Sequence, residues 1–159
     1  MSWTERNLAV QGYCLTADES TDLRWAVRFP TAVCLALVGA ALVLQSPALM
    51  FALVPVGAVA GWTRRHPFDL VWNGLVQRLG AGAVLPPNPT RRRHAFKAAT
   101  LWLLLVAALL AAGETTAATL LGLALVGACT LVTATNFCIP STLLALWSRR
   151  HRTALSSVE

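Results

Sequence analysis

The sequence has little charge, and none of it lies where an ion-coupled transporter needs it. Only 13% of the residues are charged, whereas 56% are hydrophobic and the mean hydropathy is +0.59. So little polar surface excludes a water-soluble globule and indicates a single membrane domain. No ionisable side chain falls in the middle of a long apolar run, although proton relays and ion pathways require one there. We therefore expect no pump.

Cysteine and histidine are also scarce, and their positions argue against several kinds of site. Cys34 and Cys129 fall inside apolar runs, and Cys14 and Cys138 fall in segments that we assign below to the reducing cytoplasmic side, so we expect no structural disulfide. The histidines lie at or beyond the cytoplasmic ends of the apolar runs, which argues against a haem buried in the bilayer and leaves open an interfacial pigment or metal ligand. We expect no cofactor and no metal site; these histidines are His66, His94 and His151.

Four apolar runs account for most of the chain. The first two are separated only by Ser46 and Pro47, and the last two only by residues 113–116, so each pair predicts a helical hairpin. The fold class that we expect is all-α, an integral membrane protein with four transmembrane helices. The expected division is a polar N-terminal segment at 1–24, a membrane domain at 25–150 with spans at about 27–45, 48–62, 96–112 and 116–137, and a C-terminal tail at 151–159.

The distribution of Lys and Arg predicts the orientation of the helices. All 13 basic residues lie before the first run, between the hairpins or after the fourth run, and both hairpin turns lack them. Four crossings place those three segments on one side of the membrane, which the positive-inside rule makes the cytoplasmic side. The net charge of +6 therefore indicates contact with membrane lipids, and we expect no nucleic-acid partner.

The segment between the hairpins predicts a short helix at 67–79 lying in the cytoplasmic interface. Proline at position 67 suits the first turn of a helix, and apolar residues of the segment share one face. His66, just before that proline, is interpreted as an interfacial residue, the alternative being a ligand or proton donor.

Two groups of residues are candidates for lipid binding and for helix packing. Basic residues near helix ends can hold lipid headgroups, and small residues four apart let two helices approach closely. The sequence leaves open whether the packing partner is internal or another protein. The lipid-headgroup candidates are Arg64, Arg65, Arg91, Arg92 and Arg93, and the helix-packing candidates are Gly57, Gly61, Ala118 and Gly122.

The segment from Asn136 to Ser141 carries the one candidate for thiol chemistry. Cys138 and Ser141 are spaced like a Cys-x-x-Cys pair whose second cysteine is replaced, so only mixed disulfides or persulfides with another molecule can form. We place Cys138 at the end of the fourth helix, where the helix dipole disfavours a thiolate. A packing role is therefore the simpler interpretation, and Cys138 with Asn136 and Ser141 is the alternative site.

Three motifs resemble an uncharacterised family of small bacterial four-helix membrane proteins, classified as a domain of unknown function. They are "HPFDLVWN", "LPPNPTRRRHA" and "FCIPS", within residues 22–147. The resemblance implies the fold and a bacterial inner membrane with both termini cytoplasmic. Members typically end in a Phe-Cys-x-x-Cys motif, and some relatives sit near sulfur-transfer or thioredoxin-like proteins, which implies thiol chemistry. This chain departs from that motif because Ser141 stands in place of the second cysteine, so it cannot cycle between a dithiol and an internal disulfide.

The sequence thus supports three functions in order of preference. The first is a non-enzymatic accessory subunit, without catalytic residues, that packs beside a larger membrane complex, respiratory or photosynthetic among the possibilities. The second is thiol or persulfide handling by Cys138 at the cytoplasmic face. The third is a channel or carrier for a small neutral solute, formed by an oligomer, because four short helices leave little room for a pore.

Overall fold

A computed structural model describes residues 2–80 and 83–156 of the chain, and this part is all-α. Its helices are α1 (Trp3–Gln11), α2 (Ala17–Ala26), α3 (Phe29–Val43), α4 (Pro47–Trp62), α5 (Pro67–Leu79), α6 (Thr90–Ala111), α7 (Thr115–Thr135) and α8 (Ile139–Ser156). Helix α8 extends past residue 150, where we expected the tail to begin, and residues 157–159 of that tail lie outside the described residues.

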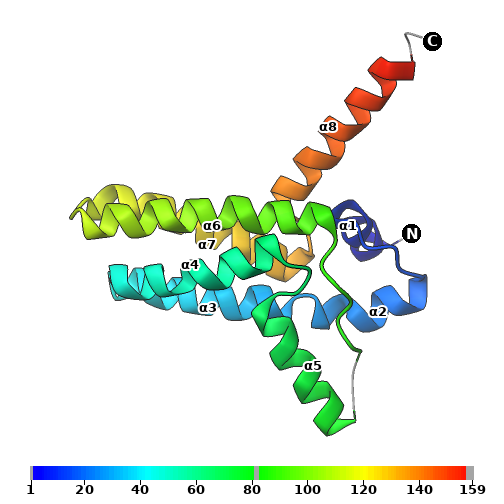
Figure 1. The fold of residues 1–159 in the computed structure, drawn as a ribbon, viewed down its shortest axis with the longest axis horizontal. Helices are drawn as coiled ribbons and strands as arrows, with labels where there is room; N and C mark the ends of the chain where they lie inside the picture. Colours follow the sequence, from blue (N-terminus) through cyan, green and yellow to red (C-terminus); the bar gives the residue numbers. More distant parts are fainter. Residues whose placement is uncertain (1, 81–82, 157–159) are drawn as a thin grey trace.

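Four helices form the central bundle as two antiparallel hairpins. Helix α3 packs against α4 and α7, and α6 packs against the same two neighbours. Figure 1 shows these helices lying along one axis, with both hairpin turns at one end and α1, α2, α5 and α8 gathered at the other. The predicted arrangement of two hairpins with a short helix between them is confirmed.

The lengths and compositions of the helices agree with a membrane protein. Residues 22–43, 90–111 and 115–135 each form a helical stretch long and apolar enough to cross a bilayer. Helix α4 has 16 residues, about 24 Å at 1.5 Å per residue, and it passes the same test only together with α5, from which it is bent by 79°. The described residues therefore hold three such helices, or four if the bent pair is one span. The chain is therefore a multi-pass membrane protein in contact with lipids.

Small residues let the bundle helices approach closely. A β-carbon on Gly57 would lie 2.5 Å from Thr100 Oγ1, and one on Gly61 would lie 2.8 Å from Lys97 Cγ, so both glycines hold α4 against α6. On the other hairpin, a β-carbon on Gly122 would lie 2.6 Å from Leu42 Cδ1. Ala118, one turn earlier in α7, is fully buried in the same core. The partners of these four small residues lie within the chain.

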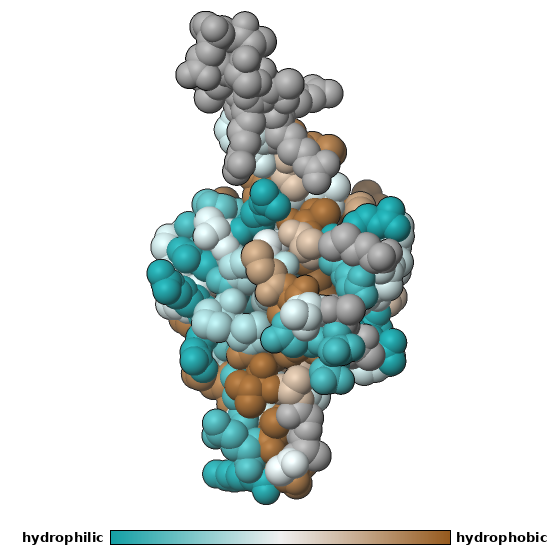
Figure 2. Space-filling view, turned by 90° about the vertical axis from the view of Figure 1, so that its right-hand side faces the viewer, coloured by the Kyte–Doolittle hydropathy of each residue, from teal (hydrophilic) through white to brown (hydrophobic). Residues whose placement is uncertain are grey.

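The N-terminal segment folds onto one end of the bundle. Helices α1 and α2 each begin with a capping box, formed by Ser2 with Glu5 and by Thr16 with Glu19. A second apolar cluster fixes these helices to the loop that precedes α6; its buried members are Leu8, Tyr13, Leu23, Ala26, Val27 and Leu85. Figure 2 looks at this end and shows hydrophilic side chains gathered over much of it.

Helices α5 and α8 leave the same end of the bundle in opposite directions (Figure 1). Each follows the second helix of a hairpin and has a proline in its first turn, Pro67 and Pro140. Both expose apolar side chains, including Leu70 and Leu75 on α5 and Leu143 and Leu146 on α8. Their positions suit two amphipathic helices lying along one surface of the membrane.

Candidate functional site

Cys138 lies at the beginning of a helix and not at the end of one. Helix α7 ends at Thr135, where Asn136 adopts the left-handed conformation with φ of 56°, and α8 begins at Ile139. The Thr142 backbone N–H donates to the Cys138 carbonyl at 3.0 Å, which makes Cys138 the residue that caps α8. The expectation that the helix dipole disfavours a thiolate here is therefore wrong, because an N-terminus favours negative charge.

The sulfur of Cys138 accepts a hydrogen bond from the residue that replaces a second cysteine. Ser141 Oγ donates to Cys138 Sγ at 3.2 Å, and the first turn of α8 sets this distance. Cys138 is 8% exposed and Ser141 is fully buried. The Cys-x-x-Ser spacing thus brings a hydroxyl donor to the sulfur in an environment that excludes most of the solvent.

Helix α1 covers the junction between α7 and α8. Gln11 Nε2 donates to the Asn136 carbonyl at 2.6 Å, and Asn7 Nδ2 donates to the Thr135 carbonyl at 3.1 Å. These amides satisfy carbonyls that the end of α7 leaves without a helical partner. Asn136 is 1% exposed, and its side-chain Nδ2 has no hydrogen-bond partner among the residues that the structure describes. A buried donor is therefore present two residues before Cys138.

Arg92 lies inside this end of the bundle, with 4% of the residue exposed. Its guanidinium donates to the Tyr13 hydroxyl and, at 2.9 Å, to the Val27 carbonyl. Burial raises the pKa of Tyr13, so this hydroxyl keeps its proton and donates it to Asn88 Oδ1 at 3.2 Å. The structure thus places Arg92 out of reach of lipid headgroups, where it joins α6 to the N-terminal segment.

The other lipid-headgroup candidates are distributed differently. Arg64 and Arg65 are exposed in the turn between α4 and α5. Arg91 and Arg93 are half-buried in the first turn of α6, and Arg91 donates to the Val10 carbonyl at 3.4 Å. Only Arg64 and Arg65 are therefore fully available to a membrane surface.

His66 is buried, with 1% of the residue exposed, which contradicts the expected interfacial position. It caps α5: His66 Nδ1 accepts the Phe68 backbone N–H at 3.1 Å, and the Asp69 carboxylate accepts the His66 backbone N–H at 2.8 Å. Since Nδ1 is an acceptor, the neutral ring carries its proton on Nε2. Nε2 lies 3.6 Å from Cys34 Sγ. Burial, followed by the charge of Arg92, lowers the pKa of His66 to about 4, so the ring is neutral at pH 7.

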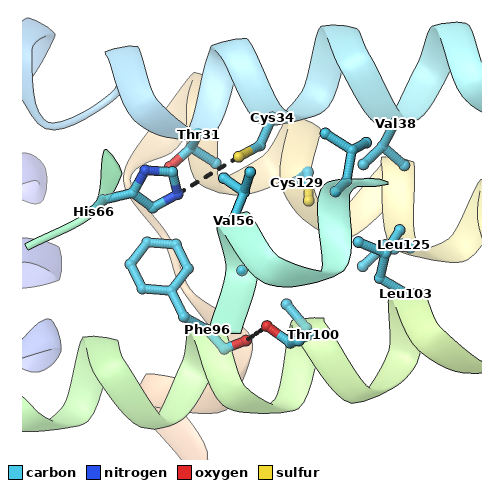
Figure 3. Close-up of a pocket in the computed structure, with 13 residues that line it drawn as sticks. Thr31, Cys34, Val38, Val56, His66, Phe96, Thr100, Leu103, Leu125 and Cys129 are labelled. Atoms are coloured by element: carbon cyan, nitrogen blue, oxygen red, sulfur yellow. Dashed lines mark hydrogen bonds between the residues drawn. The ribbon is translucent and has the colours of Figure 1, made fainter. Parts of the chain in front are cut away.

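A cavity of about 90 Å³ lies in the bundle between His66 and the deeper apolar core. Helices α3, α4, α6 and α7 all contribute side chains to it (Figure 3). Cys34 and Cys129 face it from different hairpins. Both are free cysteines and half-buried, so two thiols from different hairpins meet the same cavity.

Two parts of this arrangement escaped the sequence interpretation. The first is a series of hydrogen bonds that runs from Asp69 through Asn88 to Tyr13 and Arg92. One sequence signal pointed to part of it, because His66 and Asp69 stand three residues apart on either side of a helix-starting proline, which is the spacing of a capping box. The second is the cavity, because the periodicity of apolar residues predicts which face of a helix is buried but not whether the packed side chains leave a space unfilled. Within the described residues, no three His, Cys, Asp or Glu side chains are grouped so that they could hold a metal ion.

Residues 24–149 match the family described as a domain of unknown function, DUF4395. No curated protein and no solved structure matches the chain.

Proposed function

The chain belongs to the DUF4395 family, and on that premise we propose that it is a membrane protein that carries sulfur on Cys138. One observation carries this proposal: Cys138 Sγ accepts a hydrogen bond from Ser141 Oγ at the N-terminus of α8, with the unpartnered Asn136 amide two residues away. A helix N-terminus and a hydroxyl donor both stabilise a thiolate, which is the nucleophilic form of cysteine.

The proposed reaction transfers one sulfur atom from a persulfide donor. The Cys138 thiolate attacks the outer sulfur of a donor R–S–SH, a bond forms between the two sulfurs, and the S–S bond of the donor breaks. The leaving thiolate takes a proton, so the products are a Cys138 persulfide and R–SH, without net oxidation. We assign the buried Nδ2 of Asn136, which has no hydrogen-bond partner among the described residues, as the donor for the terminal sulfur.

Ser141 favours a persulfide over a disulfide as the stored form. A second cysteine at that position would attack the persulfide and release the sulfur, whereas a serine hydroxyl only donates a hydrogen bond. The sulfur therefore stays on the protein until another molecule removes it. We therefore propose a carrier and not an enzyme: each chain holds one sulfur atom on Cys138 until it passes that atom to another molecule.

The test is site-resolved mass spectrometry after exposure of the detergent-solubilised protein to glutathione persulfide. In a Cys14→Ser background, which removes the exposed thiol, we expect the added sulfur mass on Cys138 before Cys34 or Cys129. Ser141→Ala should slow the reaction, while Thr130→Ala, at an exposed position of α7, should leave the rate unchanged. Equal labelling of Cys138 and Cys34 would reject the proposal.

A second candidate function is an accessory subunit of a larger membrane complex, and the surface of α7 favours it. Only 17% of the apolar window of α7 is buried, against 39% for residues 22–43. Leu120 and Leu123 are exposed, and the space around Gly127 is open within 4 Å. Another transmembrane helix could pack there closely. Extraction in mild detergent tests this function: a large assembly of constant composition supports it, and a free monomer rejects it.

We further propose that the end bearing α1, α2, α5 and α8 faces the cytoplasm of a bacterial cell, with the protein in the inner membrane. The basic segments lie at this end, opposite both hairpin turns (Figure 1). An alkaline phosphatase fusion at the C-terminus should be inactive, and one inserted at Gly113 should be active. The reverse result would mean that this end faces away from the cytoplasm.

A further inference from the structure

The cavity in the bundle has features that the proposed sulfur chemistry of Cys138 does not use. Its polar end is formed by His66 and Thr31, and its deeper end by Val38, Leu103 and Leu125 (Figure 3). In the part of the chain that the structure describes, no charged side chain lines it. An unpaired ion would lose its hydration there without compensation, at a large free-energy cost. The lining therefore selects an uncharged molecule.

The volume limits the size of that molecule. An apolar cavity of about 150 Å³ in another protein stays free of water and binds benzene. A cavity of about 90 Å³ is correspondingly suited to about three or four non-hydrogen atoms. A buried water needs about two to four polar partners, and an almost wholly apolar lining offers few.

The buried imidazole supplies the orienting contact. Among the described residues, the partner of its Nε2–H group is the Cys34 sulfur, 3.6 Å away, and a thiol sulfur is a weak acceptor. A ligand oxygen would accept this hydrogen bond more strongly than the sulfur does. The ring is also fixed by its cap hydrogen bond to Phe68, so the donor is directed before a ligand arrives.

We propose that this cavity is a binding site for a small uncharged molecule of about three or four non-hydrogen atoms that accepts a hydrogen bond from His66. Its polar atom lies at the His66 end and its apolar part between Val38 and Leu125. Cys34 and Cys129 contact the ligand, so their reactivity reports occupancy.

Acetone and acetate form a matched pair of probes for this site, because they have nearly the same size and shape and differ in charge. Cys34 is modified with methyl methanethiosulfonate: its thiolate attacks the reagent's sulfenyl sulfur, forms Cys–S–S–CH₃ and releases methanesulfinate. We expect acetone to slow this modification at least threefold at saturation and acetate to have no effect. Cys14, which is exposed, is the internal standard, and its rate should not change.

Variants that fill the cavity give a second readout. Ala99→Leu and Val56→Leu place extra carbon atoms in the lining, and each should abolish the protection by acetone and slow the modification of Cys34 at least tenfold. Ala98→Leu, on the exposed face of the same helix, should behave like the parent protein. Protection by acetate equal to that by acetone, no protection by acetone, or an unchanged Cys34 rate in both filled variants would overturn the proposal. Neither result depends on Cys138, so the sulfur-carrier proposal stands or falls separately.

Discussion

Gln11 and Asn136 are joined by a 2.6 Å hydrogen bond although 125 positions separate them in the sequence. The amide of Gln11 donates to the carbonyl that follows the end of α7, and both residues are almost completely buried. This contact makes α1 a cover over the α7–α8 junction that contains Cys138.

Loosening α1 should expose Cys138. We expect Gln11→Ala to cost about 1–3 kcal/mol of stability, because it leaves the Asn136 carbonyl unsatisfied, and to raise the rate at which Cys138 reacts with iodoacetamide. Arg6→Ala, at an exposed position of α1, is the control. An unchanged Cys138 rate in Gln11→Ala would mean that α1 does not limit access.

The contact between α4 and α6 should not tolerate a methyl group at Gly57. Gly57→Ala brings a β-carbon 2.5 Å from Thr100 Oγ1, so we expect a loss of about 1–3 kcal/mol and a lower Tm in detergent. Gly39→Ala is the matched control, because a β-carbon there meets nothing within 4 Å. Adding Thr100→Ala to Gly57→Ala should restore much of the loss, and a failure to do so would contradict this account of the packing.

Stability should fall as the pH drops through the range set by His66. The folded protein holds His66 with a pKa of about 4, against 6.5 for an unperturbed histidine, so between these values the unfolded state binds the proton and the folded state does not. Stability is therefore lost from about pH 6.5 to about pH 4, by roughly 3 kcal/mol in total. Thermal melts of the parent and of His66→Asn measure this difference, because asparagine can keep the cap of α5 and does not titrate. The variant should show a smaller decline than the parent.

Arginines at this end of the bundle should separate into structural and surface groups. Arg92→Gln should lower the stability by about 2–3 kcal/mol, because the Tyr13 hydroxyl and the Val27 carbonyl lose a charged donor. Arg64→Gln with Arg65→Gln should leave the Tm unchanged and reduce the anionic lipid that copurifies. Quantitative lipid mass spectrometry distinguishes the two, and equal lipid loss in Arg92→Gln would contradict the separation.

Local sequence signals predicted much of the architecture but little of the candidate site. The helix at Pro67–Leu79 was readable from its starting proline and its apolar face, and the close packing at Gly57 and Gly61 from their spacing. The position of Cys138 at the start of a helix could not be predicted in this way. Asn136 adopts the left-handed conformation and separates two helices that form one continuous apolar pattern in the sequence. Because of that break, Cys138 lies at the positive N-terminal end of α8 and not at the negative C-terminal end of α7.

The long apolar helices and their pairing into hairpins follow from the amino-acid sequence alone, because hydrophobic length and flanking charge are local properties that the bilayer selects directly. The surroundings of His66, Arg92 and Cys138 arise only when the chain folds. Each depends on partners far along the chain, such as Cys34 for His66 and Tyr13 for Arg92. A polar side chain at the end of an apolar helix is equally compatible with lipid headgroups and with a buried network. Which of the two it meets depends on whether distant segments supply the hydrogen bonds that offset its loss of water.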